Sequence, residues 1–131
     1  MDKKIKKNML NALKDIVQYA KGIMVYGSFA KGYADKQSDI DICVIKKEGI
    51  NLKNLYDKIL QISSNKRYDI VIFDEIPWYL RGEILESGKV IYAQDDDELD
   101  FWLYKQLKIW EDMKKRQKLV SPDDLVNRLK T

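Results

Sequence analysis

Hydrophobic residues recur at two different spacings along this chain. From residue 5 to residue 20 they repeat every three or four positions, which predicts an amphipathic helix that ends at Gly22. The same helical spacing returns over residues 52–62, 76–85 and 99–113. Short runs rich in β-branched and aromatic residues separate these segments and predict strands over residues 23–26, 39–45, 67–73 and 90–92.

The order of these elements predicts an α/β fold with a small mixed β-sheet flanked by helices. Helices follow strands along most of the chain, as expected where helices pack on a sheet. Beyond its first residues, the strand over 39–45 is apolar on both faces, which is typical of a central strand covered from both sides. We therefore expect a core over residues 1–93 and a helical extension over residues 94–131.

The C-terminal extension carries a stripe of large apolar residues. Trp102, Leu103 and Trp110 follow the acidic run of residues 95–98 at broadly helical spacing. This stripe either folds back on the core or presents an apolar surface to a protein partner, and both alternatives stay open. A further short helix is predicted to begin at Ser121.

The composition of the chain limits where the protein is expected to act and what it is expected to bind. The chain has 131 residues, of which 45% are hydrophobic and 34% charged, and none of its apolar runs approaches the length of a membrane span. The basic N-terminus leads into no apolar stretch typical of a secretory signal, so we expect a cytoplasmic protein. A net charge of +3 is too small to indicate a nucleic-acid-binding surface.

Two residue types limit the possible chemistry. Cys43 is the single cysteine, and its place inside a predicted core strand favours a small buried residue over a nucleophile. Histidine is absent, so a general base must be a carboxylate, a lysine, a tyrosine or water. A zinc site of the usual cysteine and histidine composition is excluded for the same reason.

Candidate chemistry begins where the first predicted strand ends. The apolar residues 23–26 run directly into Gly27 and Ser28, so a buried strand delivers the chain into a tight turn. Backbone N–H groups exposed in such a turn can receive an anion, and a phosphate group is the obvious guest. Lys31 is either a ligand of the same phosphates or a surface lysine.

Two carboxylates mark the start of the second predicted strand. Asp39 and Asp41 lie two residues apart, so on a strand both point to the same face. Like charges this close repel, and half-burying them without a cation is costly. Mg²⁺ accepts one or two carboxylates together with substrate phosphate oxygens and water. The pair therefore predicts a metal site beside the turn and a reaction of the nucleotidyl or phosphoryl transfer class.

Each half of this pattern also has an ordinary structural explanation. Glycine and serine are common in turns, and exposed edge strands carry alternating charges that prevent aggregation. The combination is more specific than either half, because two chemically independent elements occur with ten residues between Ser28 and Asp39.

At this spacing the residues resemble the signature of the nucleotidyltransferase superfamily that includes DNA polymerase beta. The motif Gly-Ser-Phe-Ala-Lys-Gly over residues 27–32, with Ser38 before the acid pair, is most similar to the motif of the small stand-alone members of this superfamily. These members are called minimal nucleotidyltransferases, or MNT domains. The Gly-Lys-Val-Ile-Tyr ending over residues 88–92 adds to the likeness, which covers most of residues 1–92.

The resemblance assigns roles to individual residues. It implies a third acid at the start of the strand over 67–73, where Asp69 would complete the metal site and help to orient or deprotonate the attacking hydroxyl. The alternative is a strand-entry residue exposed at the end of the sheet, and Asp74 at the other end of that strand is the less favoured candidate. The implied catalytic and metal-binding residues are Asp39, Asp41 and Asp69, and the implied nucleotide-binding residues are Gly27, Ser28, Lys31 and Ser38.

The implied reaction moves AMP from ATP to a hydroxyl group with two Mg²⁺ ions and releases pyrophosphate. Small members of this family are often the antitoxin partner of a HEPN-domain ribonuclease toxin, so the resemblance implies a toxin tyrosine as acceptor. Two other classes stay open. One is a non-catalytic binding module that masks its partner with the C-terminal aromatic stripe, and the other is an enzyme that modifies a small molecule or an RNA end.

Overall fold

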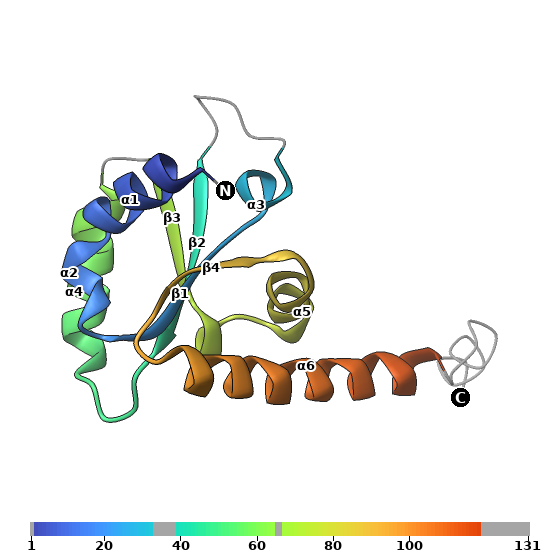
Figure 1. The fold of residues 1–131 in the computed structure, drawn as a ribbon. Coiled ribbons are helices and arrows are strands. Elements are labelled where there is room, and N and C mark those ends of the chain that lie inside the picture. Colours follow the sequence, from blue (N-terminus) through green and yellow to red (C-terminus); the bar gives the residue numbers. More distant parts are fainter. Residues whose placement is uncertain (1, 33–38, 65–66, 119–131) are drawn as a thin grey trace, which may run out of the picture.

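A four-stranded mixed sheet lies at the centre of the computed structural model, which describes residues 2–32, 39–64 and 67–118 (Figure 1). Its strand order is β3-β2-β1-β4. β1 (Ala20–Tyr26) pairs antiparallel with β2 (Ile40–Lys46) and with β4 (Lys89–Ala93), whereas β2 pairs parallel with β3 (Tyr68–Ile72). The expected α/β fold with a small mixed sheet is confirmed.

Three helices cover one face of the sheet (Figure 1). They are α1 (Lys3–Ala12), α2 (Lys14–Val17) and α4 (Leu52–Ser63). The side chain of Asn51 accepts a hydrogen bond from the backbone N–H of Asn54 at 3.1 Å, which satisfies a donor in the first turn of α4. Fully buried aliphatic residues fill the space between these helices and the sheet, among them Leu13, Ile23, Ile42 and Leu55.

The other face carries α5 (Trp78–Ser87) and α6 (Asp96–Lys118), with the short 3-10 helix η1 (Phe73–Glu75) leading into α5. β2 contributes Ile42 and Val44 to the first core, and Cys43 and Ile45 to this second core. The expectation of a central strand covered from both sides is therefore confirmed. Burial raises the pKa of the Cys43 thiol to about 12, in keeping with a packing residue rather than a nucleophile.

The expectation of one N-terminal helix ending at Gly22 is wrong. Helical geometry breaks at Leu13 (φ −97°, ψ 7°), α2 ends at Val17, and β1 already begins at Ala20. Gly22 lies inside β1, where a side-chain carbon would come within 2.8 Å of a Leu99 methyl group. The glycine thus permits close packing of α6 on the sheet and does not end a helix.

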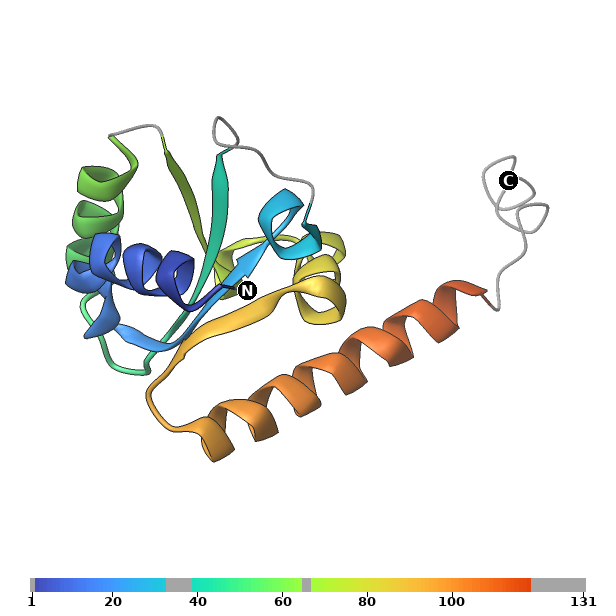
Figure 2. The same ribbon diagram turned by 45° about the horizontal axis from the view of Figure 1, so that its top comes forward.

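The aromatic stripe of the C-terminal extension divides between two environments. Leu99, Trp102 and Leu103 pack on the second core, and the Trp102 ring meets the Phe73 ring edge-on at 4.9 Å between centroids. Phe101 and Tyr104 remain 61% and 57% exposed on the same helix. Figures 1 and 2 show α6 running past α5 and extending beyond it. One face of α6 therefore packs on the core, and another presents aromatic side chains to solvent.

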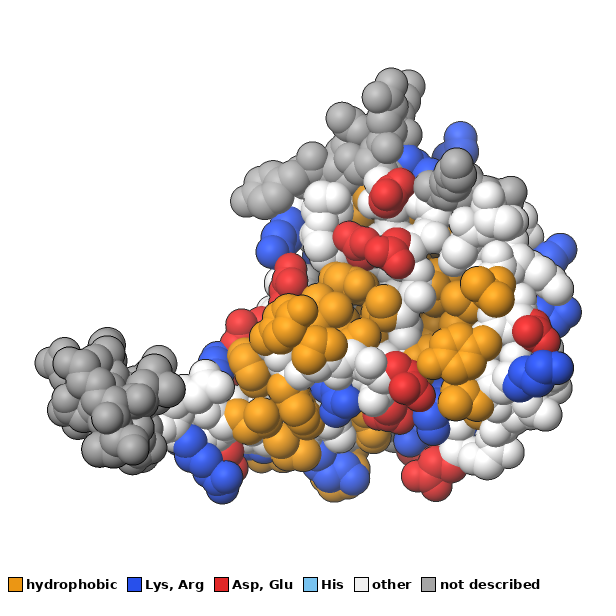
Figure 3. Space-filling model, turned by 180° about the vertical axis from the view of Figure 1, so that it is seen from behind, with side chains coloured by type: hydrophobic (Ala, Val, Ile, Leu, Met, Phe, Trp, Pro, Cys, Tyr) orange, Lys and Arg blue, Asp and Glu red, His pale blue; other side chains and the backbone are white. Residues whose placement is uncertain are grey.

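Hydrophobic side chains also gather in patches on the back of the molecule, with charged side chains around them (Figure 3). Within the described residues, none of the helices is both long and apolar enough to cross a membrane. The division at residue 93 stays a prediction. The short helix expected from Ser121 lies outside the described residues.

Helix α5 packs closely on α6 through a glycine. A side-chain carbon on Gly82 would overlap the indole ring of Trp110. The indole N–H donates a hydrogen bond to the Glu86 carboxylate at 2.9 Å, so the ring has little freedom to move aside.

Replacing Gly82 with alanine should lower the free energy of unfolding. Overpacking against Trp110, at about 1–3 kcal/mol, outweighs the roughly 1 kcal/mol that alanine gains over glycine in a helix. Urea denaturation measures the difference. In a Trp110→Ala background the same substitution should no longer destabilise, and a Gly82→Ala protein more stable than wild type would contradict this account of the α5–α6 contact.

Candidate active site

Two glycines shape the turn that follows β1. Gly27 has φ 70° and ψ −145°, a conformation that other residues adopt only with strain, and Gly32 has φ 80°. Between them lies the single-turn helix α3 (Ser28–Lys31). This geometry brings the chain sharply around at the end of a buried strand. Ser28 is half-buried there, whereas Lys31 is exposed.

The acids lie at the same end of the sheet as this turn. In the strand register Asp41 is the direct partner of Tyr26 on β1 and of Asp69 on β3. Asp39 precedes β2 and is exposed, Asp41 is half-buried, and Asp69 is exposed. A side-chain carbon on Gly27 would overlap a carboxylate oxygen of Asp41, so the carboxylate lies against the turn. The missing side chain at position 27 makes this contact possible.

Burial and like charges act together on Asp41. Desolvation raises the pKa of its carboxyl group first, and the neighbouring charges of Asp69, Asp39 and Glu83 raise it further. In the described parts of the chain no lysine or arginine forms an ion pair with Asp39, Asp41 or Asp69. Among the described residues, burial and like charges are what act on the Asp41 carboxylate, and both raise its pKa.

Tyr26 forms part of the same electrostatic neighbourhood. Its side chain is buried, and burial followed by the charges of Asp41 and Asp69 raises the pKa of the phenol. The hydroxyl therefore stays protonated at neutral pH and is available as a hydrogen-bond donor beside the acids.

Glu83 on α5 is a fourth acid that the sequence did not reveal. Its carboxylate lies 3.4 Å from the ammonium of Lys31, and its charge contributes to the raised pKa values of Asp41 and Tyr26. No motif spacing marks Glu83, because its approach to the site follows from how α5 packs on the sheet. Lys31 thus points toward α5 from its place in α3.

Two other predicted residues do not join this group. Asp74 lies in η1, beyond the opposite end of β3, where it forms an ion pair of 3.7 Å with Lys46. Ser38 lies outside the described residues. The roles assigned to the remaining residues stay predictions, although Gly27, Ser28, Asp39, Asp41 and Asp69 share one end of the sheet.

The donor set fits Mg²⁺ better than a softer metal. Among the described residues no group of three or more acidic or cysteine side chains converges closely enough to hold a metal ion by itself. Mg²⁺ does not require such a group, since one or two carboxylates with substrate phosphate oxygens and water complete its usual octahedron. Asp41 offers oxygen ligands next to a turn suited to phosphate, with Asp39 and Asp69 nearby.

The repulsion at Asp41 leads to a prediction about stability. Because folding raises the pKa of this carboxyl group, its ionised form costs stability at neutral pH, and the cost disappears as pH falls toward the unfolded value of about 3.9. Asp41→Asn should therefore raise the urea midpoint at pH 7 in metal-free buffer, and the gain should shrink as pH approaches about 4.

The matched control for this prediction is Asp74→Asn. It removes an acid that is paired with Lys46, so it should give no gain in stability. An Asp41→Asn protein less stable than wild type at pH 7 would show that the carboxylate is stabilised by a contact that outweighs the repulsion.

Comparisons with known proteins place the chain in a family. The family described as "Polymerase beta, Nucleotidyltransferase" matches residues 4–97. A protein of Methanocaldococcus jannaschii that bears the name "Putative protein adenylyltransferase" is 48% identical over 95 residues, which cover 72% of this chain and 73% of that protein.

Solved structures share the fold at lower identity. A chain from a crystal structure of a toxin-antitoxin with AMP-PNP has a TM-score of 0.68 and 18% identity, covering 92% of this chain and 98% of that chain. A chain from the complex of tri-AMPylated Shewanella oneidensis HEPN toxin with MNT antitoxin has a TM-score of 0.65 and 17% identity. The match covers 96% of this chain and 99% of that chain. The resemblance seen in the sequence is confirmed, and the chain belongs to the polymerase beta nucleotidyltransferase family.

Proposed function

We propose that this chain is a Mg²⁺-dependent protein adenylyltransferase that moves AMP from ATP to a tyrosine hydroxyl of a partner HEPN ribonuclease toxin, and so acts as its antitoxin. The observation that carries the proposal is the direct pairing of Asp41 with Asp69, beside the turn at Gly27 and Ser28. Neighbouring carboxylates beside a turn that follows a buried strand are suited to a metal-bound nucleotide.

The known relatives support the same reaction. The 48% identical protein is named for protein adenylyl transfer, and the two structural neighbours contain AMP-PNP in one case and an AMPylated HEPN toxin in the other. Transfer to a protein is also consistent with the exposed Phe101 and Tyr104 on α6, which offer apolar surface for a partner. A cytoplasmic location is part of the proposal.

Each residue then has a role in the transfer. The turn at Gly27 and Ser28 would receive the β- and γ-phosphates, and Asp39 and Asp41 would hold Mg²⁺, with Asp69 as a ligand of a second ion. When bound, Mg²⁺ neutralises charge on the phosphates. The exposed Asp69 orients the incoming hydroxyl and accepts its proton as the oxygen bonds to the α-phosphorus and the bond to pyrophosphate breaks.

Two alternative functions predict a different fate for the AMP group. A non-catalytic binding module would leave its partner unlabelled, although the burial and like charges that raise the pKa of Asp41 give no benefit in a site that never holds a cation. An enzyme acting on a small molecule or an RNA end would label that acceptor instead.

When the purified chain is incubated with Mg²⁺, α-labelled ATP and the protein encoded by the neighbouring gene, labelled AMP should appear on that protein. Asp41→Asn and Asp69→Asn should each lower the labelling rate by about a hundredfold or more, because they remove groups that act on the charge developed in the transition state. Asp74→Asn, in the same β3-to-η1 segment but at the other end of the sheet, should stay within about twofold of wild type.

Three outcomes would overturn this assignment. Label on RNA or a small molecule would move the function to another acceptor class. ATP binding without label on any acceptor would show that the chain acts as a non-catalytic binding module. Equal loss in Asp74→Asn and Asp69→Asn would show that the variants act through folding and not through the site.

A further inference from the structure

The nucleotide-binding turn is joined to α5 by one ion pair. Lys31 lies in the last position of α3, and its ammonium is 3.4 Å from a carboxylate oxygen of Glu83. Both side chains are 42% exposed, so each is long, flexible and partly solvated. Such a pair contributes little to stability. The ion pair instead affects the position of a side chain, because it determines where the ammonium of Lys31 is held.

The two partners of this ion pair are anchored to different degrees. Lys31 sits on a single turn of helix with a positive-φ glycine on either side. Glu83 sits in the middle of α5, next to Gly82, which packs against Trp110 of α6. The backbone carbonyl of Glu83 also accepts a hydrogen bond from the Ser87 hydroxyl at 2.9 Å. The backbone at Glu83 is thus held by more contacts than the backbone at Lys31.

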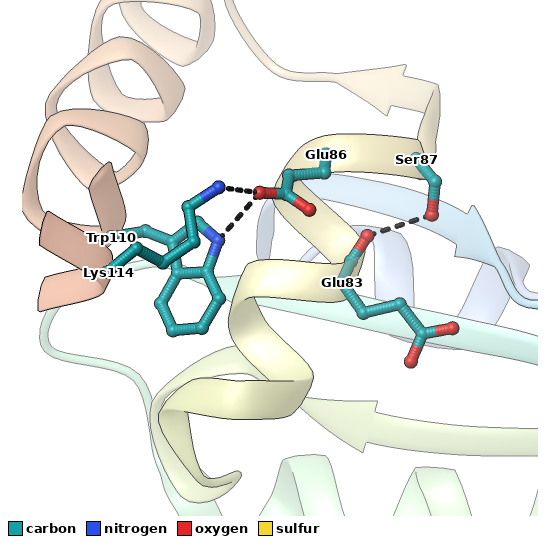
Figure 4. Close-up of polar contacts among 5 residues, drawn as sticks. All are labelled: Glu83, Glu86, Ser87, Trp110 and Lys114. Carbon is teal, nitrogen blue, oxygen red and sulfur yellow. Dashed lines mark hydrogen bonds and ion pairs between the residues drawn. The ribbon is translucent and has the colours of Figure 1, made fainter. Parts of the chain in front are cut away.

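A second acid holds α5 to α6 and leaves Glu83 free for the site. Glu86 accepts a hydrogen bond from Trp110 and forms an ion pair with Lys114 (Figure 4). In the same view the Glu83 side chain points away from Trp110 and Lys114. One helix therefore presents two glutamates in different directions, Glu86 toward α6 and Glu83 toward Lys31 and the acids.

We propose that Glu83 is a positioning residue that holds the Lys31 ammonium at the rim of the nucleotide-binding turn, so that a triphosphate meets a lysine that is already ordered. The inference rests on the proposed function. An ammonium has three N–H donors, so Lys31 can keep Glu83 and still donate to a phosphate oxygen. Without Glu83, the triphosphate must itself order a rotamer-rich side chain, which weakens binding by about three- to tenfold.

Calorimetric titration of the purified full chain with AMP-PNP in Mg²⁺ tests this directly and needs no acceptor. Glu83→Gln should weaken AMP-PNP binding by about three- to tenfold. In a Lys31→Met background the same substitution should have no further effect, because the side chain that it positions is gone. A purely structural role for Glu83 would not depend on Lys31. In the labelling reaction the loss should appear in KM for ATP, with kcat within about twofold.

Glu86→Gln is the matched control. It removes an acid from the same helix but faces α6, so it should leave AMP-PNP affinity unchanged. Unaltered or tighter binding by Glu83→Gln would overturn the inference, the second result by showing that repulsion of the triphosphate dominates. Equal weakening with and without Lys31 would overturn it as well. A wild-type chain that binds no AMP-PNP would instead overturn the proposed function, and this inference with it.

Discussion

The parallel pairing of β2 with β3 is the constraint on which the site depends. It sets Asp41 directly against Asp69, an arrangement that two carboxylates would not adopt by themselves. The rest of each strand supplies the compensation, since the next register pair joins the buried residues Ile42 and Ile70. The buried residues of β2 and β3 thus anchor the strands on which the two acids lie. Asp41 and Asp69 are held in place by the burial of the hydrophobic residues that follow them directly in each strand.

Position 27 imposes a second constraint on the same end of the sheet. The Asp41 carboxylate occupies the space where any other residue at this position would carry its side chain, and the backbone there has a conformation that favours glycine. One residue therefore both shapes the turn and admits the carboxylate. The proposed metal ligand Asp41 and the proposed phosphate-binding turn are in contact through this single position, so a substitution there would disturb both.

Features carried by local pattern were predictable from the sequence, and features decided by packing between distant segments were not. The strands, the acid pair and the turn depend on residues close together in the chain. Gly22 after a helical stripe is typical of a helix end, and only Leu99, far along the chain, shows that the glycine admits a packed side chain. Glu83 is similar, because its approach to Lys31 depends on how α5 is oriented. Phe101 and Tyr104 are exposed although they alternate in sequence with the packed Leu99, Trp102 and Leu103, so the division follows the faces of α6.

The place of β4 in the sheet has a consequence for synthesis of the chain. β1 lies between β2 and β4, and its pairing with β4 joins residue 22 to residue 93 and residue 25 to residue 89. During synthesis, the strand that leads into the turn at Gly27 and Ser28 therefore keeps one edge unpaired until residues 89–93 have emerged from the ribosome. Contacts of such sequence separation form late and slowly. The nascent protein thus completes its sheet, and the support of its site, only as the C-terminal helix begins to emerge.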